Sequence, residues 1–403
     1  MKIGLYGGMA NSMYRFAKGL QSKGVNVVLF EDLYDRYPIS QPFWDDLEMA
    51  YDYDQLGTHC FSFDEEYVPK VPFVTEKDIN DKNTPPHMLF TPKERVLMEV
   101  MKTCDVILAT GIKGPLYALK TGKPYLIWPH GGDLRQALGM IPRPKVSGLK
   151  NNVLSFLHYS LLKKSYKKSK TIVTHDPHGG IGGYQSIFVH KPFGKTVMFL
   201  PIPIPLISSN KKESLEKIAP YVDTTCVKNK KIVFIPSRID FFWKKQDILL
   251  DAMRHMSGFH LIFTGWGNDY EKAKILVRDY GLENKVTFLN KIFSRSILND
   301  FFKAADLVID QFTIGTYGTA AIEAMACGAP VMMYINNEVF EKRGWEPPPV
   351  INVKSADDIR ASLLGIEKGT IDLQKKGEEC LEWVKRVHSP ENAYDCLMKC
   401  VNW

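Results

Sequence analysis

A single acidic side chain, Glu323, interrupts an otherwise apolar stretch in the carboxyl-terminal half of the sequence. Its neighbours from Ala320 to Ala326 are alanine, isoleucine or methionine. An ionised carboxylate in such surroundings needs water or hydrogen-bond donors, because burying it unpaired is costly. Glu323 could therefore accept hydrogen bonds from the hydroxyl groups of a ligand. A partly exposed glutamate on an ordinary packing helix would explain the same pattern.

The residues around Glu323 predict a strand, a turn, a helix and a second strand, at 307–309, 313–318, 319–327 and 331–335. Gly328 and Pro330 end the helix. Together these elements form a right-handed βαβ unit of a parallel sheet, and the helix begins at the carboxyl edge, where such sheets hold ligands. The backbone amides at the helix start form an anion site, and they belong to Thr316, Tyr317, Gly318 and Thr319.

The sequence EAMACGAPV, preceded by this glycine-containing turn, closely resembles the signature of the retaining glycosyltransferases of family 4. The resemblance implies an α/β protein of GT-B fold, with two Rossmann-like domains whose parallel sheets face each other across a cleft. The family pattern is a glutamate, a glycine three residues on, and a second glutamate eight residues after the first. Gly318 and Glu323 match the last two positions, whereas Gly315 replaces the first glutamate. The resemblance implies that Glu323 holds the nucleotide ribose and that the missing glutamate would touch the transferred sugar.

A basic motif follows the strand predicted at 231–236. Ser237 and Arg238 end that strand, and Lys244 and Lys245 precede the next helix. Arginine offers a bidentate fork to phosphate, and lysine a mobile point charge. The resemblance implies that Arg238 and Lys244 grip the donor diphosphate, although one inserted residue keeps Lys245 as an alternative. A basic cluster on the surface is the competing interpretation.

Two glycine-containing turns could let the backbone approach a ligand. The strand at 2–6 ends at Gly7-Gly8, and the strand at 260–264 ends at Gly265. The resemblance implies that the first loop approaches the donor phosphates or the acceptor, and that the second borders the nucleotide base. A tight turn that needs small residues is the favoured interpretation of Gly7-Gly8 taken alone, and it explains Gly265 equally well.

His130 and Asp133 follow the strand predicted at 124–129. Histidine is well suited to donate or shuttle a proton near neutrality, although a loop histidine is often structural. The resemblance implies a donor-site loop in which His130 borders the reacting carbon, as a hydrogen-bond partner of the donor sugar more than as an obligate base.

The segment 150–170 predicts a helix with a basic end. Its apolar residues at helical spacing are Val153, Phe156, Leu157, Leu161 and Leu162, and its basic residues are Lys163, Lys164, Lys167, Lys168 and Lys170. A basic amphipathic helix can lie on an anionic bilayer. A domain helix with a solvated basic end, favoured by the helix dipole, is the alternative.

Composition limits the remaining choices. The 403 residues include 45% apolar and 24% charged residues, which is typical of a globular protein of two domains. We expect one domain at 1–205, rejoined by a helix at 388–403, and the other at 206–387. The seven scattered cysteines favour a reducing, cytoplasmic location. His175 and His178 lack a nearby third ligand, so no protein-bound metal is expected.

The resemblance implies a retaining glycosyltransferase that moves a sugar from a nucleoside-diphosphate sugar to a glycan, lipid-linked or other hydroxyl acceptor. Its role would lie in cell-surface polysaccharide or glycoconjugate synthesis, without a nucleic-acid partner. Arg238, Lys244 and the amides at 316–319 would stabilise the leaving diphosphate. A nucleotide-sugar 2-epimerase of the same fold remains an alternative, and Gly315 also keeps a catalytically silent sugar-nucleotide-binding module open.

Overall fold

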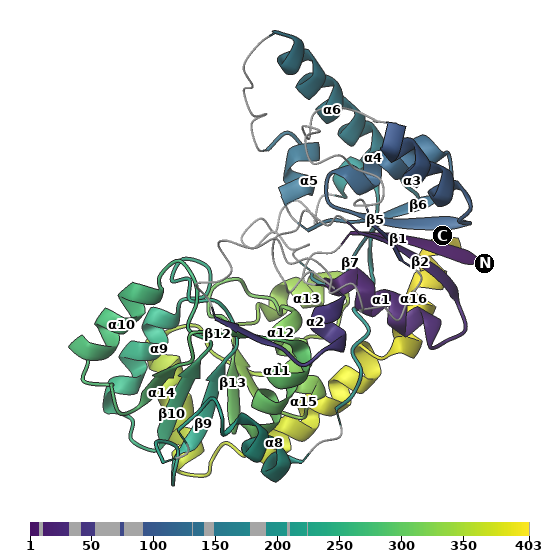
Figure 1. Cartoon of the computed structure of the whole chain (residues 1–403). Helices are drawn as coiled ribbons and strands as arrows, with labels where there is room; N and C mark the ends of the chain where they lie inside the picture. The colour runs from purple at the N-terminus through teal and green to yellow at the C-terminus, as the bar shows by residue number, and fades with distance from the viewer. Residues whose placement is uncertain are drawn as a thin grey trace. The chain divides into compact units, whose positions relative to one another are not determined.

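A computed structural model of the chain describes residues 1–7, 11–31, 42–52, 73–75, 92–130, 132–140, 149–177, 191–207, 210–223 and 225–402. The described chain divides into two compact units, each with its own parallel sheet and covering helices (Figure 1). The first unit takes described residues from 1–43, 73–203 and Pro390–Asn402, and the second takes 44–52 and those from 204–389.

The first unit is built on a sheet of seven parallel strands. In spatial order they are β4 (Phe73–Thr75), β2 (Asn26–Glu31), β1 (Lys2–Tyr6), β5 (Val106–Thr110), β6 (Tyr125–Trp128), β7 (Ile172–Thr174) and β8 (Val197–Phe199). The central strands are short apolar runs because helices cover both of their faces. Leu5 pairs in register with Leu29 and Leu108, and all three side chains are buried.

In the described residues of the first unit, six helices lie around this sheet. They are α1 (Ser12–Gln21), α3 (Pro92–Lys102), α4 (Lys113–Thr121), α5 (Gly132–Ala137), α6 (Leu149–Lys168) and α16 (Pro390–Asn402). Helix α4 packs against α3 and α6, and α16 packs against α1. The Lys170 ammonium donates to the carbonyl oxygen of Val401 at 2.6 Å. The last helix therefore belongs to the first unit.

The second unit has a sheet of six parallel strands. They are β11 (Val286–Phe288), β10 (Phe259–Phe263), β9 (Lys231–Ile235), β13 (Leu307–Ile309), β14 (Val331–Met333) and β15 (Ile351–Asn352). Its helices are α8 (Lys211–Ile218), α9 (Gln246–Ala252), α10 (Tyr270–Asp279), α11 (Arg295–Ala304), α12 (Thr319–Ala326), α13 (Asn337–Arg343), α14 (Ala356–Glu367) and α15 (Leu373–Val387). The unit β13–α12–β14 has the order predicted around Glu323.

A segment from the amino-terminal half lies in the second unit. It contains α2 (Phe43–Asp46) and β3 (Ala50–Asp52), and β3 pairs antiparallel with β12 (Lys291–Phe293). Met49 and Ser294 extend this pairing: the Ser294 amide donates to the Met49 carbonyl at 2.8 Å, and the Met49 amide donates to Ser294 Oγ at 2.9 Å. The expectation that residues 1–205 form one domain is therefore wrong for residues 44–52. The reason is a pairing between strands about 240 residues apart, which local periodicity does not reveal.

No helix among the described ranges has both the length and the apolar character needed to cross a membrane.

Candidate functional site

Three elements of the second unit bring polar groups to one edge of its sheet. Strands β9 and β13 are neighbours, so the residues that follow them lie close together. The Ser237 hydroxyl, after β9, donates to the carbonyl oxygen of Asp310, after β13, at 3.5 Å. A side chain added at Gly318, which precedes α12, would begin 3.6 Å from Asp310 Oδ2. This is the carboxyl edge, where doubly wound sheets bind ligands.

Lys244 points into this edge. Its ammonium forms an ion pair with Asp310, and its side chain is only 18% exposed. The carbonyl oxygen of Lys244 accepts a hydrogen bond from the Phe312 amide at 3.2 Å, which fixes the loop against β13. Lys245 is exposed and precedes α9 with φ of 57°. The structure thus places Lys244 among the strand ends and Lys245 outside them.

Arg238 is held by its loop but remains accessible. Its side chain is 47% exposed, and its Nε donates to Asp240 Oδ2 at 3.2 Å. Asp240 also accepts the Trp243 amide, and the buried Gln246 side chain donates to the Arg238 carbonyl and accepts the Asp240 amide. These bonds give the loop between β9 and α9 a defined shape, and they leave the outer guanidinium nitrogens available to an anion.

The turn before α12 is organised by Gln311. Its amide nitrogen donates to the carbonyl oxygens of Thr316 and Tyr334, and its oxygen accepts the amides of Thr313 and Ile314. Gly315 adopts φ of 78°, a left-handed conformation that glycine tolerates and glutamate does not favour. The backbone of this chain therefore gives a physical reason for glycine at 315.

Helix α12 begins without a side-chain cap. Gly318 is its N-cap residue in extended conformation, and no acidic residue lies in the first turn. Its first amides, including that of Thr319, are therefore suited to an anion. Thr316 Oγ1 is buried and has no hydrogen-bond partner among the described residues. The Tyr317 ring packs against Phe340, Trp383 and His388, so only its backbone faces this site.

Glu323 has a cationic partner. The side chain is 3% exposed, and it forms an ion pair with Arg295, the first residue of α11, which is 15% exposed. Arg295 Nε also lies 3.7 Å from Asp45 Oδ1, on the segment that joins this unit from the amino-terminal half. The lone charge in an apolar helix correctly indicated a need for hydrogen-bond donors, and Arg295 supplies them.

Gly265 and Gly267 let two loops approach each other. A side chain at Gly265 would begin 2.5 Å from the amide nitrogen of Asn290, and one at Gly267 would begin 2.3 Å from the carbonyl oxygen of Ile239. Both glycines have positive φ, of 69° and 128°. Close chain packing thus explains these glycines, as the tight-turn alternative proposed.

His130 and Asp133 lie together in the first unit. Asp133 Oδ1 accepts the amides of His130 at 3.0 Å and Leu134 at 2.9 Å, so it caps α5. Burial raises the pKa of Asp133 to about 6 and lowers the pKa of His130 to about 4. His130 is therefore neutral at pH 7, and its Nε2 is buried with no partner within the described part of the chain. A neutral imidazole can donate or accept one hydrogen bond there.

Gly7 allows close packing at the end of β1. It adopts φ of 120°, and a side chain there would begin 1.9 Å from Thr110 Oγ1. Gly8 lies outside the described residues, as does His178. The structure thus gives Gly7 a packing role.

Asp310, Arg295 and Gln311 were missed by sequence reasoning. Asp310 directly follows an apolar strand, so its position carried a signal of the same kind as that of Arg238. Arg295 carried no local signal, because its partner Glu323 is 28 residues away.

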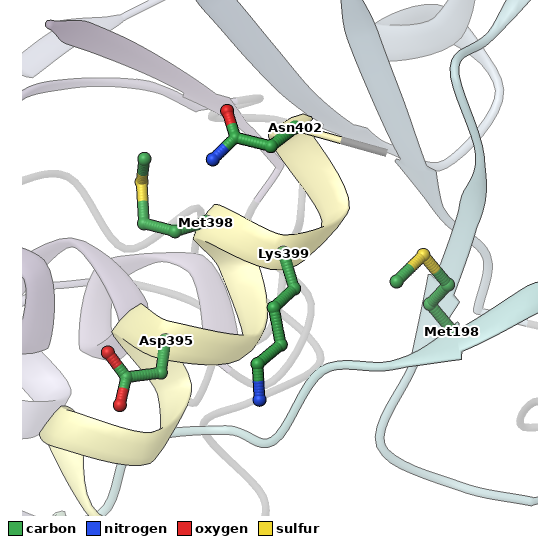
Figure 2. A pocket seen from close by; sticks show the side chains of 5 residues that line it. All are labelled: Met198, Asp395, Met398, Lys399 and Asn402. Atoms are coloured by element: carbon green, nitrogen blue, oxygen red, sulfur yellow. The ribbon is translucent and has the colours of Figure 1, made fainter.

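A pocket of about 540 Å³ lies between β8 and α16 in the first unit (Figure 2). Its lining residues are Met198, Asp395, Met398, Lys399 and Asn402. None of the predicted site residues lines this pocket.

Comparison with known proteins finds a family match within the second unit. Residues 223–341 match the model of the family described as glycosyl transferases group 1. A D-inositol 3-phosphate glycosyltransferase of Mycolicibacterium smegmatis is 36% identical over 109 residues, which cover 26% of this chain and 25% of that protein. A mannosylfructose-phosphate synthase of Agrobacterium fabrum is 31% identical over 109 residues, 24% of each chain. The matches thus span about a quarter of these curated relatives' length.

Solved structures match the whole chain in fold. HepE of Anabaena, solved with UDP and glucose, has a TM-score of 0.65 at 15% identity and covers 100% of this chain and 99% of its own. Sucrose-phosphate synthase of Thermosynechococcus elongatus has a TM-score of 0.63 at 14% identity and covers 99% and 97%. The fold implied by the resemblance is confirmed: the chain has the GT-B fold, and residues 223–341 match the model of the glycosyl transferases group 1 family.

Proposed function

We propose that this protein is a retaining glycosyltransferase that uses a nucleoside-diphosphate sugar. The observation that carries the proposal is the grouping of Arg238, Lys244 and the uncapped start of α12 at one sheet edge, within the segment that matches the family. Two cations beside the backbone amides of a helix start that has no side-chain cap suit a diphosphate. The buried Glu323, which is paired with Arg295, suits the hydroxyls of a ribose.

The proposed reaction breaks the bond between the sugar and the diphosphate. Negative charge grows on the leaving diphosphate, and Arg238, Lys244 and the α12 amides would stabilise it electrostatically. A leaving phosphate oxygen would take the proton of the acceptor hydroxyl, which attacks from the same face. His130 would be a neutral hydrogen-bond partner of the donor sugar. We propose this reaction without a protein-bound metal.

The donor can be proposed more specifically than the acceptor. HepE has been solved with UDP-glucose, so UDP-sugars are the first donors to test. The acceptor is not transferred from the curated relatives, because the matches span only about a quarter of each relative's length. We propose a glycan or lipid-linked acceptor in cell-surface polysaccharide or glycoconjugate synthesis.

Release of nucleoside diphosphate from a panel of UDP-, GDP- and ADP-sugars tests this function, and Arg238→Ala is its key variant. The variant should lower kcat/KM by about 100- to 1,000-fold, the usual effect of losing one group that stabilises developing charge. Arg254→Ala is the matched control, because its side chain is also 47% exposed and lies in the same unit. Equal activity of the two variants would contradict the diphosphate site.

The same panel separates the alternatives. A 2-epimerase would convert the donor alone into an epimer with the nucleotide still attached. A silent binding module would bind a nucleotide but release none from any donor. Retention of the anomeric configuration in the transferred product would support the proposed reaction class.

We further propose a cytoplasmic location with peripheral contact to an anionic membrane through α6. Val153, Phe156 and Leu157 in its first turns are 50%, 59% and 45% exposed. Four exposed lysines follow on the same helix: Lys163, Lys164, Lys167 and Lys168. Spacings of three, four and seven residues place both groups on one side. The six described cysteines, which form no disulfide, are consistent with a reducing compartment.

A further inference from the structure

The carboxylate of Asp310 takes no part in the proposed reaction, yet it contacts the lysine assigned to the diphosphate. Asp310 is 1% exposed and directly follows β13. One of its oxygens, Oδ1, forms the ion pair with the Lys244 ammonium. Lys244 is still 18% exposed, so a ligand can reach the same ammonium from the solvent side.

The second oxygen of Asp310 is aimed at the start of α12. Oδ2 is buried and has no hydrogen-bond partner among the described residues. It lies 3.6 Å from the point where a side chain on Gly318 would begin, and Gly318 is the N-cap residue of α12. A negative charge of the protein itself therefore lies at the place that the proposed function assigns to a diphosphate.

We propose that Asp310 is a positioning residue that competes with the diphosphate for the Lys244 ammonium. This inference rests on the proposed function. A phosphate oxygen and Asp310 Oδ1 would each lie about 2.7–3.2 Å from Nζ, so the two oxygens would be at most about 6 Å apart. Like charges at that separation in a partly buried site repel each other. Asp310 thus holds Lys244 in place before the donor arrives and weakens the hold on the nucleoside diphosphate product afterwards.

The competition predicts a change in affinity that a merely structural carboxylate would not produce. Asp310→Asn keeps the side-chain shape and removes the charge. It should tighten binding of UDP, GDP or ADP, whichever the intact parent protein binds, by about tenfold in calorimetric titration. In a Lys244→Met background the same change should move the affinity by a smaller factor than in the parent, because the direct repulsion remains but no ammonium is left to be shared. Asp300→Asn removes an equal charge from α11, where Asp300 pairs with Lys217 at 3.6 Å, and should leave the affinity unchanged.

A second measurement needs no nucleotide. In the parent protein, Lys244 should be methylated by formaldehyde and a borohydride more slowly than the exposed Lys245, as read by peptide mass spectrometry. In Asp310→Asn, and in Asp310→Ser as a second variant, Lys244 should react severalfold faster while Lys245 stays unchanged. Equal Lys244 rates in parent and variants would overturn the positioning role.

The outcomes separate this inference from the proposed function. If the parent binds a nucleoside diphosphate and Asp310→Asn binds it equally or more weakly, the competition is wrong and the proposed donor site stands. If the parent binds none of the three nucleotides, both the proposed donor site and the competition at Lys244 are wrong.

Discussion

His130 and Asp133 share one hydrogen bond, but burial shifts their pKa values in opposite senses. The pKa of Asp133 is raised to about 6, so between about pH 4 and pH 6 the folded chain holds a proton that the unfolded chain has lost. Its contribution to stability therefore falls as the pH rises through this window. The pKa of His130 is lowered to about 4, so its contribution is lost as the pH falls from about 6.5 to 4. In the parent protein the two effects oppose each other.

Asp133→Asn should expose the effect of His130. Asparagine can keep the Oδ1 cap of α5, but it does not take up the proton. Relative to the parent, the variant should lose about 3 kcal/mol of stability between pH 7 and pH 4, since a shift of about two pKa units corresponds to that amount. Denaturant unfolding at pH 7, 5.5 and 4 measures this difference.

His130→Gln serves as the reciprocal control. It should gain stability relative to the parent over the same decrease in pH, because it cannot acquire a proton. Parallel pH profiles for the parent and both variants would show that neither group titrates as described.

For individual residues, the sequence indicated which side chains could bind a ligand, but it did not indicate which side chains contact one another. Arg238 was singled out because it directly follows a buried strand, and the resemblance assigned the diphosphate to Arg238 and Lys244. The choice between Lys244 and Lys245 needed the structure, since it depends on which side chain reaches Asp310. Gly315 was read as a missing glutamate, and its φ of 78° now supplies a backbone reason that no residue pattern contains.

Helices α11 and α12 are joined by a buried ion pair. Arg295→Met should leave the Glu323 carboxylate buried without its cation, which costs about 3–5 kcal/mol when one partner of such a pair is removed. The free energy of unfolding in denaturant measures the loss. It should be accompanied by weaker nucleotide binding, since Glu323 is the group that we assign to the ribose.

Asp45→Asn is the control for Arg295→Met. Asp45 Oδ1 lies 3.7 Å from Arg295 Nε, a longer contact than the Arg295–Glu323 pair, so this variant should lose less stability. A larger loss in Asp45→Asn would mean that Arg295 mainly serves the amino-terminal segment and that Glu323 has other support.

Helix α6 differs from the amphipathic helix that its sequence predicts. Leu162 is fully buried and Leu161 is half-buried, so part of the apolar side packs on the domain. The remaining apolar residues and the lysines share the solvent side and follow one another along the axis. Helical spacing alone predicted the helix but could not show which leucines pack inward.

Replacing Lys163, Lys164, Lys167 and Lys168 by Gln should release the protein from anionic vesicles. Each basic residue near such a surface contributes about 1 kcal/mol, so four should lower the bound fraction severely. Flotation with phosphatidylglycerol vesicles measures the effect. The control replaces four exposed lysines of the second unit: Lys212, Lys228, Lys368 and Lys375. Equal flotation of both variants, or none of the parent, would remove the membrane role.

Residues 44–52 lie early in the sequence but pack in the unit that is built mainly from later residues. The strands predicted at 2–6, 124–129, 231–236, 260–264, 307–309 and 331–335 match sheet strands, because each is a short apolar run between turn residues. Strands β4, β8 and β15 were not predicted. Strand β3 was not predicted, since its partner β12 lies far along the chain and neither has a long pattern of its own. Residues 44–52 thus belong by contact to the unit that follows them.

Because residues 44–52 pack in the second unit, their amides should be protected from hydrogen exchange when a nucleotide binds to that unit. A ligand at about 100 times its dissociation constant adds about 2.7 kcal/mol to the stability of the unit that binds it. The groups that we assign to the nucleotide all belong to the second unit, so amides of β9, β13 and β12 should exchange hydrogen more slowly when the nucleotide is bound. The amides of β3 should gain the same protection, because β3 is hydrogen-bonded to β12.

Strands β1 and β5 are the internal reference for this exchange experiment. They pair with each other at the centre of the first unit, and the nucleotide should leave their exchange nearly unchanged. The comparison has to be made at the slow, globally protected amides, because surface amides open locally at low cost and report little on either unit. Protection that rises in β1 and β5 but not in β3 would contradict both the spatial assignment of residues 44–52 and the placement of the nucleotide in the second unit.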